Sequence, residues 1–158
     1  MWSVEPAVPA DAEGVLAVTR KAFEPYRAKY PVPPDPLRED LEGIRQDIAR
    51  ERVWVARSGG RVIGAVRARP MAGRDATYEL YGLAVDPEYS QLDVGKSLVW
   101  AVEDRLRQQG VRAVHLQTGL RDAPAIEFWY RLGYRPFRLD PDPDPAGGYD
   151  RVWFAKEW

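Results

Sequence analysis

The chain has 158 residues, of which 45% are hydrophobic and 30% are charged, which predicts one folded domain over residues 1–158 with roughly two thirds of its unfolded surface buried. Its formal net charge of −1, without a basic cluster, excludes a nucleic-acid partner, because such binding depends on many neutralised phosphates. Zero cysteines exclude disulfides, thiolate zinc sites and cysteine nucleophiles, and a single histidine argues against a histidine-based metal site.

The first third of the chain predicts one short strand and two helices. Residues 4–8 have a strand pattern, and Asp11 is the predicted N-cap of a helix whose apolar stripe runs over residues 15–23. The segment YPVPPDP cannot form regular structure. It ends in Asp35 and Pro36, which we expect to cap and open a second helix that continues to Ile48.

The pattern then changes to that of strands. Residues 52–58 and 61–69 are valine-rich, and Gly59 and Gly60 between them predict a two-residue hairpin turn with positive φ. A third strand over residues 77–86 ends at Pro87. An amphipathic helix over residues 94–109 and a strand over residues 112–117 follow, an order that predicts a right-handed parallel crossover.

The last third predicts one more helix and an antiparallel strand pair. Asp122 can cap a helix over residues 123–132, and residues 134–138 and 149–156 have strand patterns. The whole order predicts an α/β (α+β) domain with a mixed central sheet of about six to seven strands flanked by about four helices.

Nothing in the sequence indicates a membrane partner. No apolar run approaches the roughly 20 residues that span a bilayer. The stretch MWSVEPAVPADAE has no basic segment followed by an apolar one. We therefore expect a cytoplasmic protein.

Gly95, Lys96 and Ser97, at the start of a predicted helix, allow two interpretations. The first is the end of a P-loop, G-x-x-x-x-G-K-[ST], which holds the phosphates of a nucleotide and magnesium. The required first glycine falls on Ser90, however, and Gly95 is the one residue of this turn that adopts unusual φ cheaply. A nucleotide site would thus depend on a three-residue match.

The second interpretation involves most of the chain. The stretch LYGLAVDPEYSQLDVGKSLVWAVEDRLRQQG, followed by APAIEFWYRLGYRP, resembles the GCN5-related N-acetyltransferase (GNAT) superfamily in its acyl-CoA-binding motif and the segment after it. In element order the resemblance covers residues 2–154. It implies a single GNAT-like domain with a splayed parallel strand pair. It also implies direct transfer of an acetyl group from acetyl-CoA to a primary amine of a small molecule or protein, with no metal.

The resemblance also implies where acetyl-CoA binds. Pantetheine is expected in the gap between the splayed strands, and the pyrophosphate over the next helix N-terminus, where unpaired N–H groups and the helix dipole favour an anion. Asp122 and Trp129, in the last helix region, are assigned to the same site. The other implied cofactor-binding residues are Leu83, Ala84, Val85, Gln91, Asp93, Val94, Gly95, Lys96 and Ser97.

Asp93 departs from the family pattern [QR]-x-x-G-x-[GA], in which it takes the place of the first glycine. As a helix cap, its carboxylate would accept a hydrogen bond from the N–H of Gly95 or Lys96, worth roughly 1 kcal/mol. Alternatively, the carboxylate occupies the anion site and repels pyrophosphate. The chain would then be a GNAT-like domain that does not bind CoA and acts as a ligand-binding or interaction module.

Two residues are candidates for the chemistry. Glu79 matches a glutamate found in several relatives and is the candidate base, with an outward-facing charge on a strand as the alternative. The tyrosine that commonly serves as the acid is replaced by Trp129, whose indole cannot give up a proton. Tyr130 is then the candidate acid, although one step along a helix rotates a side chain by about 100°. His115, in mid-strand, is expected to be structural.

The resemblance implies that the segments YRAKYPVPPDP and LDPDPDPAGG determine which acceptor binds, and Tyr78 and Tyr81 could line the acceptor pocket or be core residues. The aspartates of the second segment would form a negative rim for a cationic amine or, alternatively, belong to a solvated, proline-stiffened loop. Aromatic residues near the end of the chain, Trp153 and Trp158 among them, allow a homodimer, although such residues also pack cores.

Overall fold

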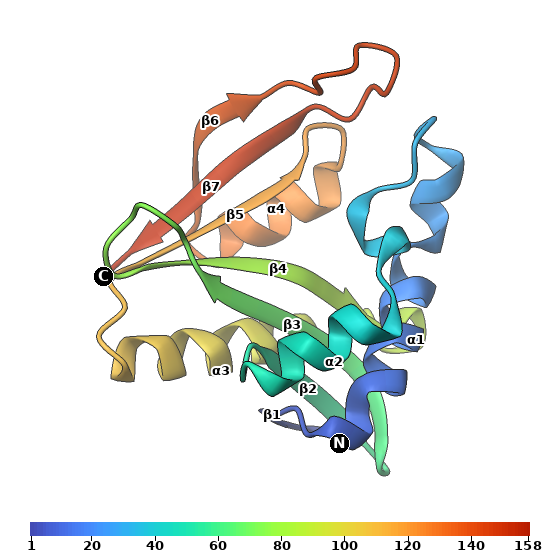
Figure 1. Cartoon of the computed structure of the whole chain (residues 1–158), viewed down its shortest axis with the longest axis vertical. Coiled ribbons are helices and arrows are strands. Elements are labelled where there is room, and N and C mark those ends of the chain that lie inside the picture. Colours follow the sequence, from blue (N-terminus) through green and yellow to red (C-terminus); the bar gives the residue numbers. More distant parts are fainter.

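A mixed seven-stranded sheet forms the centre of the protein, in the strand order β1-β2-β3-β4-β5-β7-β6. The computed structural model describes all 158 residues. Figure 1 shows the sheet with its helices in sequence colours. The strands are β1 Ser3–Pro6, β2 Val53–Ser58, β3 Arg61–Pro70, β4 Thr77–Val85, β5 Ala113–Gly119, β6 Arg135–Asp140 and β7 Arg151–Glu157. The helices are α1 Ala12–Phe23, α2 Leu41–Ala49, α3 Val94–Gln108 and α4 Ala123–Arg131.

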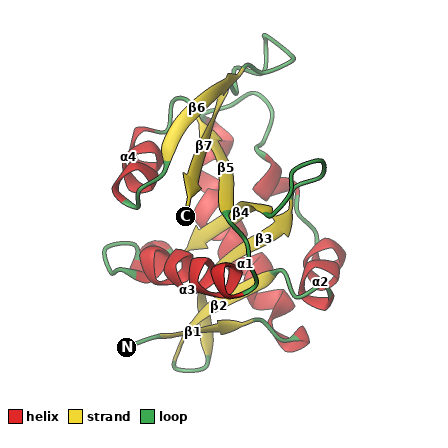
Figure 2. Ribbon diagram, turned by 90° about the vertical axis from the view of Figure 1, so that its left-hand side faces the viewer, coloured by secondary structure: helices red, strands yellow, loops and turns green.

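The helices cover both faces of the sheet and bury two apolar clusters. One cluster joins α1 and α2 to the sheet through residues such as Val15 and Ile44, and both of these side chains are fully buried. The larger cluster joins α3 and α4 to the opposite face through residues such as Leu98 and Trp129. Figure 2 shows α3 and α4 on one side of the sheet and α2 on the other.

The parallel pair β4 and β5 is joined over only part of its length. Residues 77–79 of β4 pair with residues 113–115 of β5, and beyond them no pairing joins the two strands. Figure 1 shows the strands diverging from this point. β5 continues on its other edge with β7 up to Gly119. The remaining part of β4 therefore borders a gap on the β5 side, as the GNAT resemblance implies.

A bulge at Gly82 alters β4 beside this gap. The register passes from Arg67–Tyr81 to Ala65–Ala84, so two residues of β4 lie opposite one of β3. Gly82 has φ +64, and a Cβ there would lie 2.5 Å from Nη2 of Arg67. Only glycine combines this backbone conformation with so close an approach of the arginine.

Asp86 fixes the turn that leads from β4 to α3. Its side chain is 5% exposed, accepts from the N–H of Glu88 at 3.0 Å, and pairs with Lys21 at 3.1 Å and Arg61 at 2.9 Å. Burial acts to raise the pKa of this carboxyl, but the hydrogen bond from Glu88 and the two cations outweigh it and hold the pKa below 3.8. The turn is thereby tied to α1 and β3.

Two helix starts differ from the sequence-based expectation. Residues Asp35–Arg38 form a separate 3-10 turn, and Glu39 is extended, so α2 begins at Leu41. Its cap is Asp40, whose side chain accepts from the N–H of Gly43 at 2.8 Å. At the start of α1, the Asp11 side chain makes no cap bond, because it accepts from Val8 N–H and pairs with Arg57.

The aromatic residues of the final strand are used inside the molecule. Trp153 and Phe154 are 8% and 1% exposed, and Trp158 packs partly against the larger cluster. Trp153 and Phe154 are therefore core residues, which agrees with the alternative that these aromatics pack the core, whereas Trp158 is only partly buried. Each helix is too short or too polar to cross a membrane.

Candidate active site

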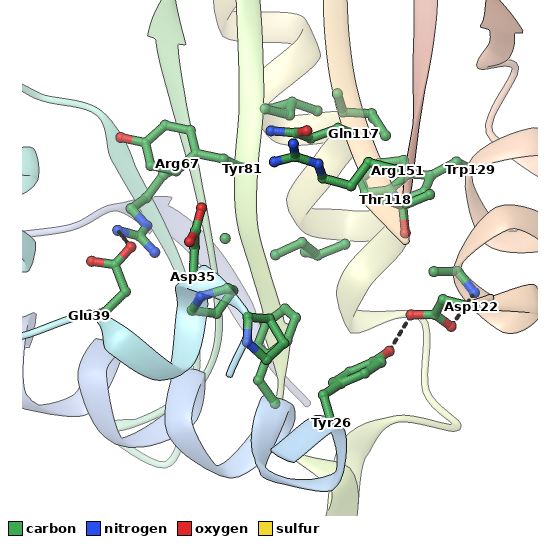
Figure 3. Close-up of a pocket in the computed structure, with 18 of the residues that line it drawn as sticks. Tyr26, Asp35, Glu39, Arg67, Tyr81, Gln117, Thr118, Asp122, Trp129 and Arg151 are labelled. Atoms are coloured by element: carbon green, nitrogen blue, oxygen red, sulfur yellow. Dashed lines mark hydrogen bonds and ion pairs between the residues drawn. The ribbon is translucent and has the colours of Figure 1, made fainter. Parts of the chain in front are cut away.

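The gap between β4 and β5 opens into a cleft of about 1130 Å³. Leu83 and Val85 of β4 form one wall, and Phe128 and Trp129 of α4 form part of the other. Figure 3 shows the far end of the cleft, where Tyr26 and Asp35 approach from the segment between α1 and α2. The cleft thus extends from the N-terminus of α3 to the predicted acceptor segments.

At the α3 end, backbone N–H groups are free to bind an anion. No carbonyl or side chain accepts a hydrogen bond from the N–H of Gly95 or Lys96, whereas the N–H of Ser97 is bonded to the carbonyl of Asp93 at 2.9 Å. Gly95 and Lys96 both line the cleft. The free donors and the positive end of the helix dipole together favour a phosphate group here.

Asp93 does not cap α3, so that expectation is wrong. Its backbone adopts φ −72 and ψ 33, and its side chain accepts no capping hydrogen bond. The carboxylate is 74% exposed and lies 3.6 Å from the ammonium of Lys96. It therefore accepts no hydrogen bond from the free N–H groups, but it lines the cleft and its charge lies near them.

The other residues of this turn divide into two sets. Gln91 lines the cleft, but the Val94 side chain is fully buried in the core beneath the turn. Ser97 does not line the cleft, because its Oγ donates to the carbonyl of Asp93 at 2.8 Å. The side chains of Val94 and Ser97 are thus placed away from the expected cofactor site, and the hydroxyl that a P-loop needs is already bonded.

Beside this turn, β4 presents an open edge to the cleft. Leu83 and Val85 line it, whereas the Ala84 side chain is 2% exposed and faces the core, so any contact of Ala84 with a cofactor would come from its backbone. Beyond Glu79 the edge of β4 that faces β5 has no ladder partner. Trp129 is 7% exposed, packs against Phe128 and Tyr134, and also lines the cleft.

Asp122 joins two walls of the cleft. One oxygen of its carboxylate accepts from the N–H of Ala125 at 3.2 Å and caps α4, as predicted. The other accepts from the hydroxyl of Tyr26, in the segment after α1 (Figure 3). Burial and the neighbouring carboxylate raise the pKa of Tyr26. Both oxygens of Asp122 are engaged, so this residue shapes the cleft.

The two candidates for acid and base chemistry differ in position. Glu79 lies in the cleft, is 7% exposed, and accepts from Nε of Arg69 at 3.1 Å. Tyr130 lies outside the cleft: it is 52% exposed, and its ring packs under the guanidinium of Arg135 at 3.8 Å. The rotation between neighbouring helix positions turns Tyr130 outward when Trp129 faces in.

His115 and Tyr81 complete the chemistry-bearing residues of this region. His115 is 7% exposed, lies against Phe137 with ring centroids 5.0 Å apart, and does not line the cleft. Burial, together with the charge of Arg74, lowers its pKa. Tyr81 does line the cleft, and burial raises its pKa to about 12.

The loop before β7 is organised by its own aspartates. Asp142 accepts from the N–H of Asp144 at 3.0 Å and from that of Tyr149 at 2.9 Å, and these bonds lower its pKa. Asp144 in turn accepts from the N–H of Ala146 at 2.9 Å. These bonds favour the interpretation of a structured loop over a dedicated binding rim.

Two arginines of the cleft, Arg67 of β3 and Arg151 of β7, were not among the predicted site residues. The alternation of Arg67 and Arg69 in a valine-rich strand predicts that this strand has a polar face. It does not predict which acidic residues pair with the arginines, because those residues lie in distant segments of the chain. Gly82, in the interior of β4, could have indicated the position of Arg67, because a glycine inside a strand often marks a bulge or a place where another group approaches the backbone closely.

Comparisons with known proteins agree with this geometry. The model of the acetyltransferase (GNAT) family matches residues 16–134. The chain is 32% identical over 116 residues to the probable N-acetyltransferase camello of Xenopus tropicalis, covering 72% of this chain and 53% of that protein. It is 27% identical over 157 residues to S-(2-succino)cysteine N-acetyltransferase of Bacillus subtilis, covering 96% and 93%.

A solved structure supports the fold. The PaiA N-acetyltransferase from Thermoplasma acidophilum, in complex with coenzyme A, superimposes with a TM-score of 0.81 at 18% identity, covering 100% of this chain and 99% of that one. Among curated proteins, the chain spans about half the length of relatives such as camello. The Bacillus relative, in contrast, is matched over nearly its whole length.

Proposed function

The chain belongs to the acetyltransferase (GNAT) family, and from this premise we propose that it transfers an acetyl group from acetyl-CoA directly to a primary amine of a small molecule. The observation that carries the proposal is the single cleft that joins the unpaired edge of β4, the free N–H groups of Gly95 and Lys96, and the buried carboxylate of Glu79. In this proposal the strand edge binds pantetheine, the N–H groups bind the pyrophosphate, and the carboxylate takes a proton from the amine.

The residues at the α3 end fit the cofactor. The N–H groups of Gly95 and Lys96 and the Lys96 ammonium would bind the pyrophosphate. The open edge of β4 at Leu83 and Val85 would pair with the amides of pantetheine, and Trp129 would pack against the chain. Acetyl-CoA supplies the acetyl group as a thioester. The alternative of a CoA-deficient domain loses its main support, because the Asp93 carboxylate does not occupy the free donors.

Glu79 would act as the general base, directly or through one water. The ammonium of the acceptor loses a proton to its carboxylate, and the amine nitrogen forms a bond to the thioester carbon. The carbon–sulfur bond then breaks, the electron pair leaves with the thiolate, and the second proton of the amine nitrogen is released to water, which leaves the neutral amide. Neither Trp129 nor the outward-facing Tyr130 provides a proton in the cleft, so in this proposal the thiolate leaves without an acid from the protein.

A small-molecule acceptor is supported by the relative matched over most of its length, which is named for the acetylation of S-(2-succino)cysteine. The same chemistry on a protein amine is the alternative, because the structural neighbours include ribosomal-protein-alanine N-acetyltransferases. In the wider cleft, Phe23, Val32 and Pro33 provide apolar surface at the acceptor end.

Calorimetric titration with acetyl-CoA, and with free CoA as comparison, tests the cofactor part of the proposal. Binding with a dissociation constant of order micromolar is expected, and absence of binding up to millimolar ligand would refute it. Release of CoA thiol in the presence of an amine panel that includes S-(2-succino)cysteine then tests the transfer. The purified Glu79→Gln variant should bind acetyl-CoA like the unchanged protein but release thiol far more slowly.

A further inference from the structure

Arg67 is a buried cation with a free donor. Its side chain is 2% exposed, and Nη1 pairs with Glu39 at 3.0 Å and with Asp47 at 3.1 Å. Nη2 is also buried, yet it has no hydrogen-bond partner. Arg67 lines the cleft, and Figure 3 shows its guanidinium directed into the space beside Asp35. A buried guanidinium that has no acceptor for one of its nitrogens can bind an acceptor oxygen supplied by a ligand.

The surroundings hold Arg67 in this position. The guanidinium lies 4.9 Å from the ring centre of Tyr81, and Arg69 lies 4.1 Å from the same centre. Gly82 leaves room for the guanidinium where any Cβ would collide with it. An arginine that is stacked, paired and confined in this way needs little ordering when a planar anion binds.

A second cation faces the cleft from the opposite wall. Arg151 of β7 has a buried Nε with no partner, and its Nη2 lies 3.6 Å from Asp140, beyond hydrogen-bond distance. In Figure 3 its guanidinium lies next to Gln117 of β5 and extends toward β4. The Oε1 of Gln117 is likewise buried without a partner.

The cleft also contains carboxylates. Glu39 and Asp47 lie beside Arg67, with Asp35 near them, and the lining elsewhere includes Glu79, Asp93, Asp122, Asp142 and Asp144. A polyamine would bring several positive charges toward the two arginines, and a phosphate monoester would bring two negative charges toward these carboxylates. A zwitterion, with one carboxylate and one ammonium on neighbouring atoms, matches both kinds of charge.

The register places the base at a suitable distance. Arg67 lies opposite Tyr81 and Arg69 lies opposite Glu79. Two residues along a strand correspond to roughly 7 Å. An α-amino acid whose carboxylate reaches Nη2 of Arg67 can therefore direct its amine toward Glu79.

Building on the proposed transferase function, we propose that the acceptor is an α-amino acid whose carboxylate is bound by Arg67, with Arg151 as the second cationic group. The test compares acetyl transfer to the twenty standard L-amino acids and to S-(2-succino)cysteine with transfer to the amides of their α-carboxyl groups, which keep the side chain and lose the α-carboxylate charge. For the best amino acid, kcat/KM is expected to be roughly tenfold or more higher than for its own amide, because the amide has no carboxylate to accept the hydrogen bond that Arg67 offers.

Variants locate the effect. Arg67→Gln and Arg151→Gln should each raise the KM for the amino acid by roughly tenfold and leave the KM for the amide and for acetyl-CoA unchanged. Arg131→Gln is the matched control, because Arg131 is an exposed arginine of α4 paired only with Glu127. The comparison of acid with amide on the unchanged protein needs no variant, so the test stands even if Arg67→Gln does not fold.

Equal or better transfer to the amides, or transfer to none of these amino acids, S-(2-succino)cysteine included, overturns this inference. The calorimetric titration with acetyl-CoA decides separately whether the proposed transferase function stands. If the protein binds acetyl-CoA but acetylates only amines that lack a carboxylate, the proposed transferase function stands and the amino-acid acceptor is refuted.

Discussion

The Asp93 carboxylate is expected to weaken acetyl-CoA binding by its charge alone. It accepts no hydrogen bond from the helix N-terminus, but its position beside Lys96 places it next to the free N–H groups of Gly95 and Lys96. Two unit charges 4 Å apart interact by about 1 kcal/mol in water and about 4 kcal/mol at an effective dielectric of 20. Because the carboxylate is 74% exposed, the lower value applies.

Asp93→Asn keeps the shape of the side chain and removes the charge. The dissociation constant for acetyl-CoA should fall about fivefold at low salt, the equivalent of about 1 kcal/mol. The gain should nearly vanish at 1 M salt, where the screening length is about 3 Å. Stability to urea should change by less than about 0.5 kcal/mol, because no capping bond is lost.

Two controls make this prediction specific. Asp104→Asn removes an exposed carboxylate eleven residues further along α3, about 16 Å away at 1.5 Å per residue, and should not affect the affinity. S-acetylpantetheine, which lacks the pyrophosphate, should bind equally to the unchanged protein and to Asp93→Asn. An unchanged affinity for acetyl-CoA, or an equal gain with S-acetylpantetheine, would refute the assignment of the α3 N-terminus to the pyrophosphate.

Three further variants test the base, the bulge and the turn. Glu79→Gln should lower kcat by about 10²–10⁴ in a thiol-release assay with the KM for acetyl-CoA within about twofold, and an unchanged kcat would exclude Glu79 as the base. Gly82→Ala should lower the free energy of unfolding in urea by about 2–5 kcal/mol, because the alanine would have an unfavourable positive φ and its Cβ would collide with Arg67. Gly73→Ala, where φ is +75 and no atom lies near the added Cβ, should lower it by about 1–2 kcal/mol. Equal losses in the two variants would contradict the packing argument. The pKa of Asp86 is lower in the folded protein than in the unfolded chain, so its contribution to stability is complete above pH 3.8 and is lost as the pH falls through the folded pKa. Asp86→Asn should therefore have a smaller free energy of unfolding at pH 7 and lose less of it on acidification. Parallel plots of unfolding free energy against pH for the two proteins would count against the ion pairs.

The sequence predicted those parts of the fold that local chemistry decides. Gly59 and Gly60 form the expected turn with φ of +57 and +77, and Asp122 caps α4 through its side chain. The start of α2 was predicted wrongly because Asp35 and Asp40 are both acceptable caps, and the choice between them depends on how the proline-rich segment packs.

The site was less predictable, because its properties arise between distant segments. Whether Asp93 caps α3 depends on the backbone angles of one turn, and a pattern of residue types does not contain those angles. The free donor of Arg67 results from two acids in the region before β2 and from a bulge in β4. The outward position of Tyr130, in contrast, follows from helix geometry once Trp129 is known to face inward.

One physical principle relates the two ends of the cleft. A folded chain ordinarily pairs its buried polar groups, yet a buried guanidinium nitrogen of Arg67 is unpaired. At the other end of the cleft, the N–H groups of Gly95 and Lys96 have no acceptor within the chain, as is usual at a helix N-terminus. The buried nitrogen of Arg67 costs free energy while it lacks an acceptor, and the rest of the fold must offset that cost. The N–H groups at the α3 end match the phosphates of acetyl-CoA, and Arg67 beside the β4 bulge matches a carboxylate. Because β4 borders both places, this one strand sets the distance between the group that would bind the phosphates and the group that would bind the acceptor's carboxylate.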